Sequence, residues 1–215
     1  MNLPVSFKHA AYELQNILKH PEQLLLILGT PIGLLFAFKN YANIANFSIA
    51  SCALASSFTS VAINTSFARR YGTLKYLSVT PVGLKGIVGG QIMVGICLLI
   101  LQLPVVFFVT EVIQINSGPD WKVFAVLPIL ILFFTQLAFL LSSVLSAEKV
   151  LAFANLAFLV LLASGLMLWQ SDYAFFHPLA GVVQINDLFF GYLAVLSTSN
   201  FVVFFALRRY FRWID

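Results

Sequence analysis

The chain has 215 residues, of which 60% are hydrophobic and only 9% are charged. A soluble domain carries roughly 25% charged residues, so this composition excludes an ordinary soluble protein and predicts the lipid bilayer as the main solvent. The net charge of +4 does not indicate nucleic acid as a partner, because no basic face sits on a soluble fold. We therefore expect one all-α integral membrane domain over residues 1–215.

The first expected element is an amphipathic helix over residues 6–20. Its apolar residues recur at spacings of three and four, and its charged residues fall mostly on the other side. The segment is too charged to cross a membrane, so we expect it to lie in the cytoplasmic headgroup layer. The His20-Pro21 pair marks its end, because the residue before proline avoids the helical conformation.

Six apolar stretches follow, each near the ~20 residues needed to cross ~30 Å of hydrocarbon. The predicted transmembrane helices cover residues 24–38, 44–67, 87–112, 124–146, 150–169 and 188–207. Basic residues set the orientation, since they collect on the cytoplasmic side of membranes. With the N-terminus inside, ten basic residues are cytoplasmic and two, Lys39 and Lys122, are external. Both termini are therefore expected in the cytoplasm.

The second span is unusually rich in serine and threonine. Small residues let helices approach closely, and hydroxyls bond across the interface, so a packing helix is one interpretation. The other is a helix that lines a passage at a subunit interface. In that case the expected lining residues are Ser56, Ser60 and Asn64, with Asn155 of the fifth span.

The pattern of ionisable residues does not predict an active site. Charged residues are nearly absent from membrane depth, and the three histidines lie outside the predicted spans. Ser164 lacks the glycine of a G-x-S-x-G element and a histidine partner, which argues against serine hydrolysis. Cys52 and Cys97 lie in apolar runs and do not form a metal site. We expect no catalytic residue, no metal and no cofactor on this chain.

Two connections are longer than a turn. The cytoplasmic one, residues 68–86, starts with Arg69 and Arg70 and turns at Gly72. Thr73 is positioned to cap a short helix that Thr80-Pro81 would end, with Leu74 and Leu77 on one face. The external one, residues 170–187, has an apolar centre too short to cross, and we expect a re-entrant or interfacial segment.

The pattern G-T-L-x-x-L-x-x-T-P, from Gly72 to Pro81, resembles the cytoplasmic loop of type-2 ABC transporter permeases. The first helix with Glu13-Leu14 looks like the connecting helix of that family. His177-Pro178-Leu179 looks like its re-entrant element. The resemblance covers essentially the whole chain in order, but Ala68, Arg69 and Arg70 stand where members often carry acidic residues. Any charge contact there would be reversed in sign.

The resemblance implies a transmembrane subunit of an ATP-driven exporter in the bacterial plasma membrane. It would pair with a second permease copy or a paralogue, and each half would dock a nucleotide-binding ATPase subunit that holds ATP and Mg²⁺. The loop 68–86 would be the coupling helix, and the residues implied in coupling are Arg69, Arg70, Gly72, Thr73, Leu74, Leu77, Thr80 and Pro81. The uncharged spans favour a hydrophobic or amphiphilic substrate.

Three alternatives stay open at the level of sequence. A haem-export-like permease of cytochrome maturation would have the same fold and a similar length. A membrane scaffold or assembly factor would act without an ATPase. A membrane enzyme is the third, and the missing His, Asp and Glu in the spans argue against it.

Overall fold

The computed structural model describes residues 5–19, 21–72, 83–115 and 118–210. Within these ranges the chain is helical with short turns and contains no β-strand, which confirms the expected all-α fold. The main helices are α1 (Val5–Leu18), α2 (Pro21–Ala37), α3 (Ile44–Ala53), η1 (Leu54–Thr59), α4 (Ser60–Arg70), α6 (Gly83–Val112), α7 (Trp121–Val144), α8 (Ala147–Leu168) and α9 (Ile185–Tyr210). Two short 3₁₀ turns, η2 (Ala174–Phe176) and η3 (Ala180–Val182), precede α9.

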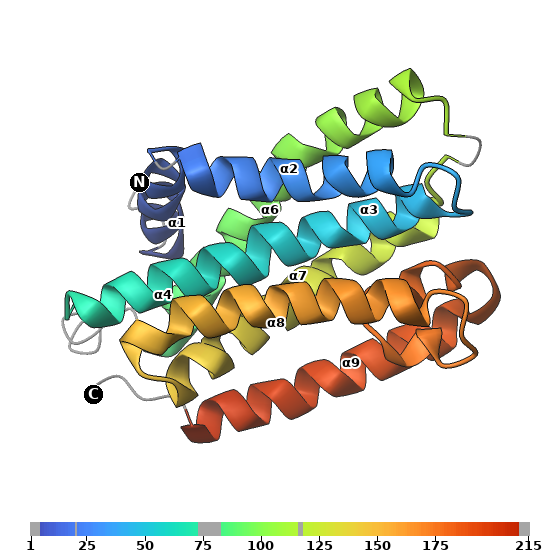
Figure 1. The fold of residues 1–215 in the computed structure, drawn as a ribbon. Helices are drawn as coiled ribbons and strands as arrows, with labels where there is room; N and C mark the ends of the chain where they lie inside the picture. Colours follow the sequence, from blue (N-terminus) through green and yellow to red (C-terminus); the bar gives the residue numbers. More distant parts are fainter. Residues whose placement is uncertain (1–4, 20, 73–82, 116–117, 211–215) are drawn as a thin grey trace.

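The helices other than α1 run between two ends of the molecule (Figure 1). Elements α3, η1 and α4 follow one another without a break and form one long rod. We call the end where α4 ends and α6 begins the basic end, because it carries Lys19, Arg69, Arg70, Lys149, Arg208 and Arg209. The other end, which holds the turns before α3, α7 and α9, is the opposite end. Helix α1 lies across the basic end (Figure 1).

Local sequence explains where several helices start and stop. Pro21 begins α2, where the missing N–H of proline has no intrahelical partner to lose. Asp120 caps α7 by accepting a hydrogen bond from the Lys122 N–H at 2.9 Å. Gly72 follows α4 with φ of +70°, a left-handed conformation that favours glycine. The expected turn at Gly72 is therefore confirmed.

The centre of the molecule is the rod formed by α3, η1 and α4. Every residue from Ile44 to Ala62 is buried, because α2, α6, α7 and α8 all pack against this stretch. Alanine and serine make up much of it, and small side chains let the neighbouring helices approach closely. Phe47 packs against Trp169 with ring centroids 5.0 Å apart, which holds the end of α8 against the rod.

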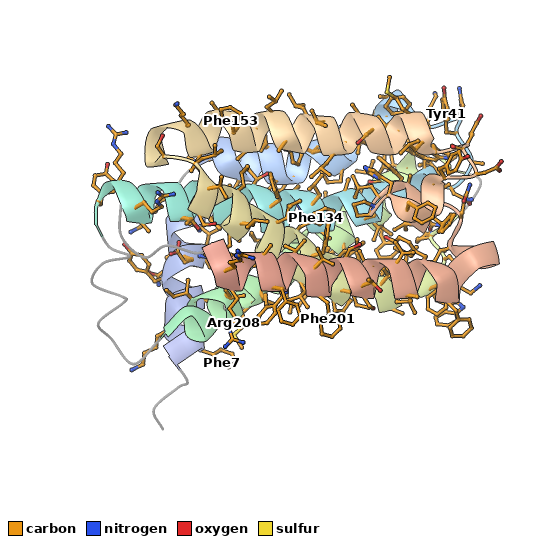
Figure 2. The ribbon with its side chains drawn as sticks, turned by 90° about the horizontal axis from the view of Figure 1, so that it is seen from below. Phe7, Tyr41, Phe134, Phe153, Phe201 and Arg208 are labelled. Atoms are coloured by element: carbon orange, nitrogen blue, oxygen red, sulfur yellow. The ribbon has the colours of Figure 1, made fainter. Side chains whose placement is uncertain are left out.

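Large apolar side chains cover the outer faces of the bundle. Phe153 of α8 and Phe201 of α9 are exposed at opposite edges of the molecule (Figure 2). Four helical stretches are long and apolar enough to cross a membrane: Ile44–Ala62, Gly86–Val112, Trp121–Val144 and Phe189–Arg209. The apolar parts of α2 and α8, Leu24–Ala37 and Ala152–Leu168, are shorter. These features are consistent with a multi-pass membrane protein, and the expected number of six spans stays a prediction.

Helix α1 packs by one face and leaves the other open. Ala10 and Ile17 are buried against Ile27 of α2 and against Val94 and Leu98 of α6. The outer face exposes apolar side chains, Phe7, Tyr12 and Leu18, beside the exposed Lys8 and Lys19. Such a mixture of apolar and basic groups suits a membrane surface, and the expected place of this helix in the headgroup layer stays a prediction.

Candidate functional site

The predicted lining residues fall in two separate places. Ser56, Ser60 and Asn64 are buried inside the chain on η1 and α4. Asn155 lies on the exposed face of α8 and does not join them. The Ser60 hydroxyl donates to the backbone carbonyl of Ser56, whereas both polar atoms of the Asn64 amide lack a partner among the described residues. The packing interpretation therefore accounts for the serines, and Asn64 and Asn155 need another explanation.

A π-helical turn, η1, interrupts the central rod over Leu54–Thr59. Turns of this kind are rare and are often found at functional sites. Next to it, Gly95 of α6 approaches so closely that an added Cβ would lie 2.8 Å from Ser57 Oγ and 3.2 Å from Ile131 Cγ2 of α7. Gly95 thus lets three helices meet closely at the level of the serine-rich turn, and a side chain there would have to displace Ser57 and Ile131.

Several buried polar atoms without partners in the part of the chain that the structure describes lie on the three helices that meet here. Gln91 lies one helical turn from Gly95, and Thr135 one turn from Ile131, both about 6 Å toward the basic end at 1.5 Å per residue. Asn64 lies two turns from Ser57 in the same direction. The buried atoms without a hydrogen-bond partner in the described chain are Ser57 Oγ, Thr59 Oγ1, Asn64 Nδ2 and Oδ1, Gln91 Oε1, Gln102 Oε1, Thr135 Oγ1, Gln136 Oε1 and Asn200 Oδ1. Most of these atoms are hydrogen-bond acceptors, and leaving them buried without a donor costs stability.

The buried amides use their N–H groups on backbone carbonyls of neighbouring helices. Pro31 has no N–H, so the carbonyl of Ile27 one turn earlier loses its helical donor. The Gln102 Nε2 of α6 donates to that carbonyl at 2.7 Å, which links α6 to α2. The Asn200 Nδ2 donates to the Leu196 carbonyl of its own helix at 3.0 Å and to the Ile129 carbonyl of α7 at 3.4 Å. These bonds fix the orientation of both amides, so the atoms left without partners are the carbonyl oxygens.

At the basic end, the last two residues of the central rod, Arg69 and Arg70, have different surroundings. Arg69 Nη1 donates to the backbone carbonyls of Ser142 and Leu145, the latter at 2.6 Å, where α7 ends. The last carbonyls of a helix lack intrahelical donors, and a cation is favourable there. Arg69 therefore holds the end of α7, while Arg70 is exposed. The remaining predicted coupling residues, Thr73, Leu74, Leu77, Thr80 and Pro81, lie outside the described residues.

Glu13 of α1 is a buried acidic residue at this end. Its side chain is 8% exposed, and burial raises its pKa from 4.5 to about 7. A carboxyl group with this pKa is partly protonated near neutral pH. Helix α1 thus contacts α6 through a face that combines apolar packing with one titratable group.

At the opposite end, residues between α8 and α9 fold into the end of the bundle. Leu179, Ala180 and Val182 are fully buried. Tyr192 of α9 donates its hydroxyl to the Pro178 carbonyl at 2.5 Å, and the Asn43 amide donates to the Val183 carbonyl at 3.2 Å. The segment is therefore held by a side chain of α9 and by the side chain of the residue that precedes α3.

His177 occupies the centre of this segment and contacts Ser164 of α8. The His177 Nε2 and Ser164 Oγ atoms are 3.0 Å apart, so the expectation that Ser164 has no histidine partner is wrong. The Nδ1 atom accepts hydrogen bonds from the N–H groups of Leu179 and Ala180, each at 3.2 Å. Nε2 must then carry the proton and donate to Ser164, whose hydroxyl donates to the Val160 carbonyl. A histidine in this tautomer cannot accept the serine proton, so the pair joins two segments rather than activating a nucleophile.

Sequence reasoning missed the pairing of Ser164 with His177. No local signal predicts that Ser164 faces His177, since they are joined by a turn whose course depends on tertiary packing. The described residues hold no group of three His, Cys, Asp or Glu side chains able to bind a metal ion. Comparison with known proteins identifies no relative: no family model matches, and neither a curated protein nor a solved structure is similar. The fold itself defines the class, an all-helical protein with several helices able to cross a membrane.

Proposed function

We propose that the chain is a transmembrane permease subunit of an ATP-driven exporter in a bacterial plasma membrane, with both termini in the cytoplasm. ATP is hydrolysed on a separate nucleotide-binding subunit, and the substrate is hydrophobic or amphiphilic. In this proposal a second permease copy or a paralogue completes the transporter. The proposal rests on the resemblance of residues 72–81 to the coupling loop of type-2 ABC permeases.

The position of the motif is the observation that carries the proposal. Gly72 follows the end of α4 and Gly83 begins α6, both at the basic end, so the motif between them is attached to that end on both sides. Helix α1 lies across the same end, as a connecting helix would (Figure 1). In Figure 2, Phe7 of α1 and Arg208 of α9 both lie toward the basic end of the molecule, away from Tyr41. An ATPase subunit bound at this end could move α4 and α6 together.

Within the proposal, Arg70 is the arginine that contacts the ATPase subunit. It is exposed, whereas the Arg69 guanidinium is already committed to the end of α7. Arg69 then contributes indirectly, because it fixes the last turn of α4 and so the base from which the motif begins. Leu74 and Leu77 supply the apolar contact surface.

The test is co-purification of the chain with the ATPase subunit encoded beside it. We expect wild type to retain that subunit, and Leu74→Asp with Leu77→Asp to reduce retained ATPase at least ~10-fold, since two buried charges each cost more than 1.4 kcal/mol. The matched control places two aspartates at the opposite end, Asn40→Asp with Gln170→Asp, at exposed positions. The control should retain the ATPase as wild type does.

Two results would contradict the proposal. One is a wild-type chain that brings down no ATP-hydrolysing subunit, which is what a scaffold without transport predicts. The other is a double Leu→Asp variant that retains the ATPase as well as the control does.

A further inference from the structure

Asn155 is an amide at the middle of an outward-facing helix surface. It is the ninth of the 22 residues of α8 and is exposed. Ala152, Leu159 and Ala163 lie three, four and eight residues away on the same face, and all are exposed. If α8 crosses the membrane, this face meets hydrocarbon, and Asn155 lies within about 4 Å of its midpoint at 1.5 Å per residue.

No residue that the structure describes bonds the Asn155 amide. Hydroxyl side chains on the outer parts of α2 and α9, in contrast, donate hydrogen bonds to backbone carbonyls of their own helix. Thr30 donates to the Leu26 carbonyl at 2.7 Å, and Thr198 donates to the Ala194 carbonyl at 2.8 Å. An asparagine has two donors and an acceptor, and neither lipid tails nor alanine and leucine neighbours can pair them. An amide left this way in hydrocarbon is strongly unfavourable, so the face requires a polar partner.

We propose that this partner is Asn155 of a second copy of the chain, and that α8 packs against α8 of that copy around a two-fold axis. A symmetric contact brings each residue near the axis to its own equivalent. An amide is complementary to itself, because its N–H₂ group donates to the carbonyl oxygen of the other amide. Ala152 and Ala163 flank Asn155 and allow the two helices to approach closely.

This inference specifies the dimer contact of the proposed exporter, but it requires only that α8 lies in the membrane. It does not depend on an ATPase subunit, so its test uses the chain alone, in vesicles made from membranes that express it. Failure of the ATPase co-purification would leave this contact in place, and failure here would leave the coupling surface in place.

The first experiment is cross-linking through Asn155→Cys. Cys52 and Cys97, which are free, are first replaced by alanine and serine. A disulfide needs Cα atoms within about 7 Å, which only residues near a two-fold axis achieve. With a membrane-permeant oxidant we expect a covalent dimer of Asn155→Cys. The control is Phe201→Cys of α9, which is exposed at the opposite edge of the bundle and should stay monomeric (Figure 2).

The second experiment measures self-association by energy transfer between labelled copies in vesicles. Asn155→Leu should weaken dimerisation roughly ten-fold, because it removes the pair of interhelical hydrogen bonds, while Asn155→Gln should keep most of the affinity. Size-exclusion profiles confirm that each variant is folded. The proposal is overturned if Asn155→Cys cross-links no better than Phe201→Cys, or if Asn155→Leu associates as tightly as wild type.

Discussion

At the residue scale, Arg69 and Arg70 are adjacent, but one stabilises the fold and the other is available for the proposed contact with the ATPase subunit. Both were expected to take part in coupling, since sequence shows only that they are basic and close to Gly72. The structure places the Arg69 guanidinium against the last carbonyls of α7 and leaves Arg70 exposed. A side chain that satisfies helix-end carbonyls stabilises the fold, whereas an exposed one is available to a partner.

Arg69→Gln should therefore mainly lower stability, whereas Arg70→Gln should mainly lower retention of the ATPase subunit. Arg69→Gln should lower the free energy of unfolding by about 1–2 kcal/mol, because it removes charged hydrogen bonds from the end of α7. Arg70→Gln should change it by less than about 0.5 kcal/mol, as exposed substitutions usually do. Thermal unfolding in detergent measures the difference.

The same two variants are then compared for ATPase retention. The expected order is that Arg70→Gln retains less ATPase per folded chain than Arg69→Gln. Equal stability of the two variants would show that the α7 contact is not a stabilising one.

At the scale of elements, the segment between α8 and α9 depends on a neutral histidine. Burial lowers the pKa of His177 from 6.5 to about 4. Its Nδ1 accepts two backbone N–H groups, and protonation would turn this acceptor into a donor. The unfolded chain binds the proton near pH 6.5 and the folded chain only near pH 4. The stability that the neutral ring provides is thus present above pH 6.5 and falls as pH decreases to about 4.

His177→Asn tests this dependence. The Asn Oδ1 can accept from the same backbone N–H groups and does not titrate in this range. We expect the wild-type unfolding temperature to fall between pH 6.5 and pH 4 by more than that of the variant. Subtracting one profile from the other removes the contribution of carboxylates that titrate between the same pH values. Parallel profiles would mean that His177 is not held neutral by the fold.

Sequence predicted the helices well, because their signals are local. The predicted stretch 44–67 corresponds to the rod Ile44–Arg70, and 87–112 to α6, Gly83–Val112. Apolar length, proline and the charges at the ends determine such limits. The π-helical turn at Leu54–Thr59 was not predicted, because nothing in its serine-rich composition differs from that of an α-helix with the same residues.

The candidate site was predictable only in part. Serine content identified the central rod, but not that every residue from Ile44 to Ala62 is buried, because burial depends on how many helices surround it. Gln102 bonds the Ile27 carbonyl that Pro31 leaves without a donor, a contact that depends on how α6 packs against α2. The link between Ser164 and His177 depends on the folded path of residues 170–184. Pairings of this kind are set by tertiary packing and leave no periodic signal.

At the scale of the whole molecule, the burial of the central rod bears on the expected number of six membrane crossings. The apolar part of α2, residues 24–37, extends about 21 Å, and that of α8, residues 152–168, about 25 Å. Both are shorter than the ~30 Å hydrocarbon core. Yet α2 and α8 pack against η1 in the middle of the rod, so they lie at its depth. If the rod crosses, its serine-rich centre stays covered only when α2 and α8 cross with it.

Single cysteines at the two ends should therefore alternate in accessibility. In a chain without Cys52 and Cys97, we expect Lys19→Cys and Lys149→Cys to react with an impermeant maleimide only after permeabilisation, since basic residues stay inside. Asn40→Cys and Gln170→Cys should react in intact cells. If α2 does not cross, positions 19 and 40 will share one side, and if α8 does not, positions 149 and 170 will. The two positions on either side of α2 therefore show whether α2 crosses, and the two on either side of α8 show whether α8 crosses. Six crossings require the two positions to differ in accessibility for both helices.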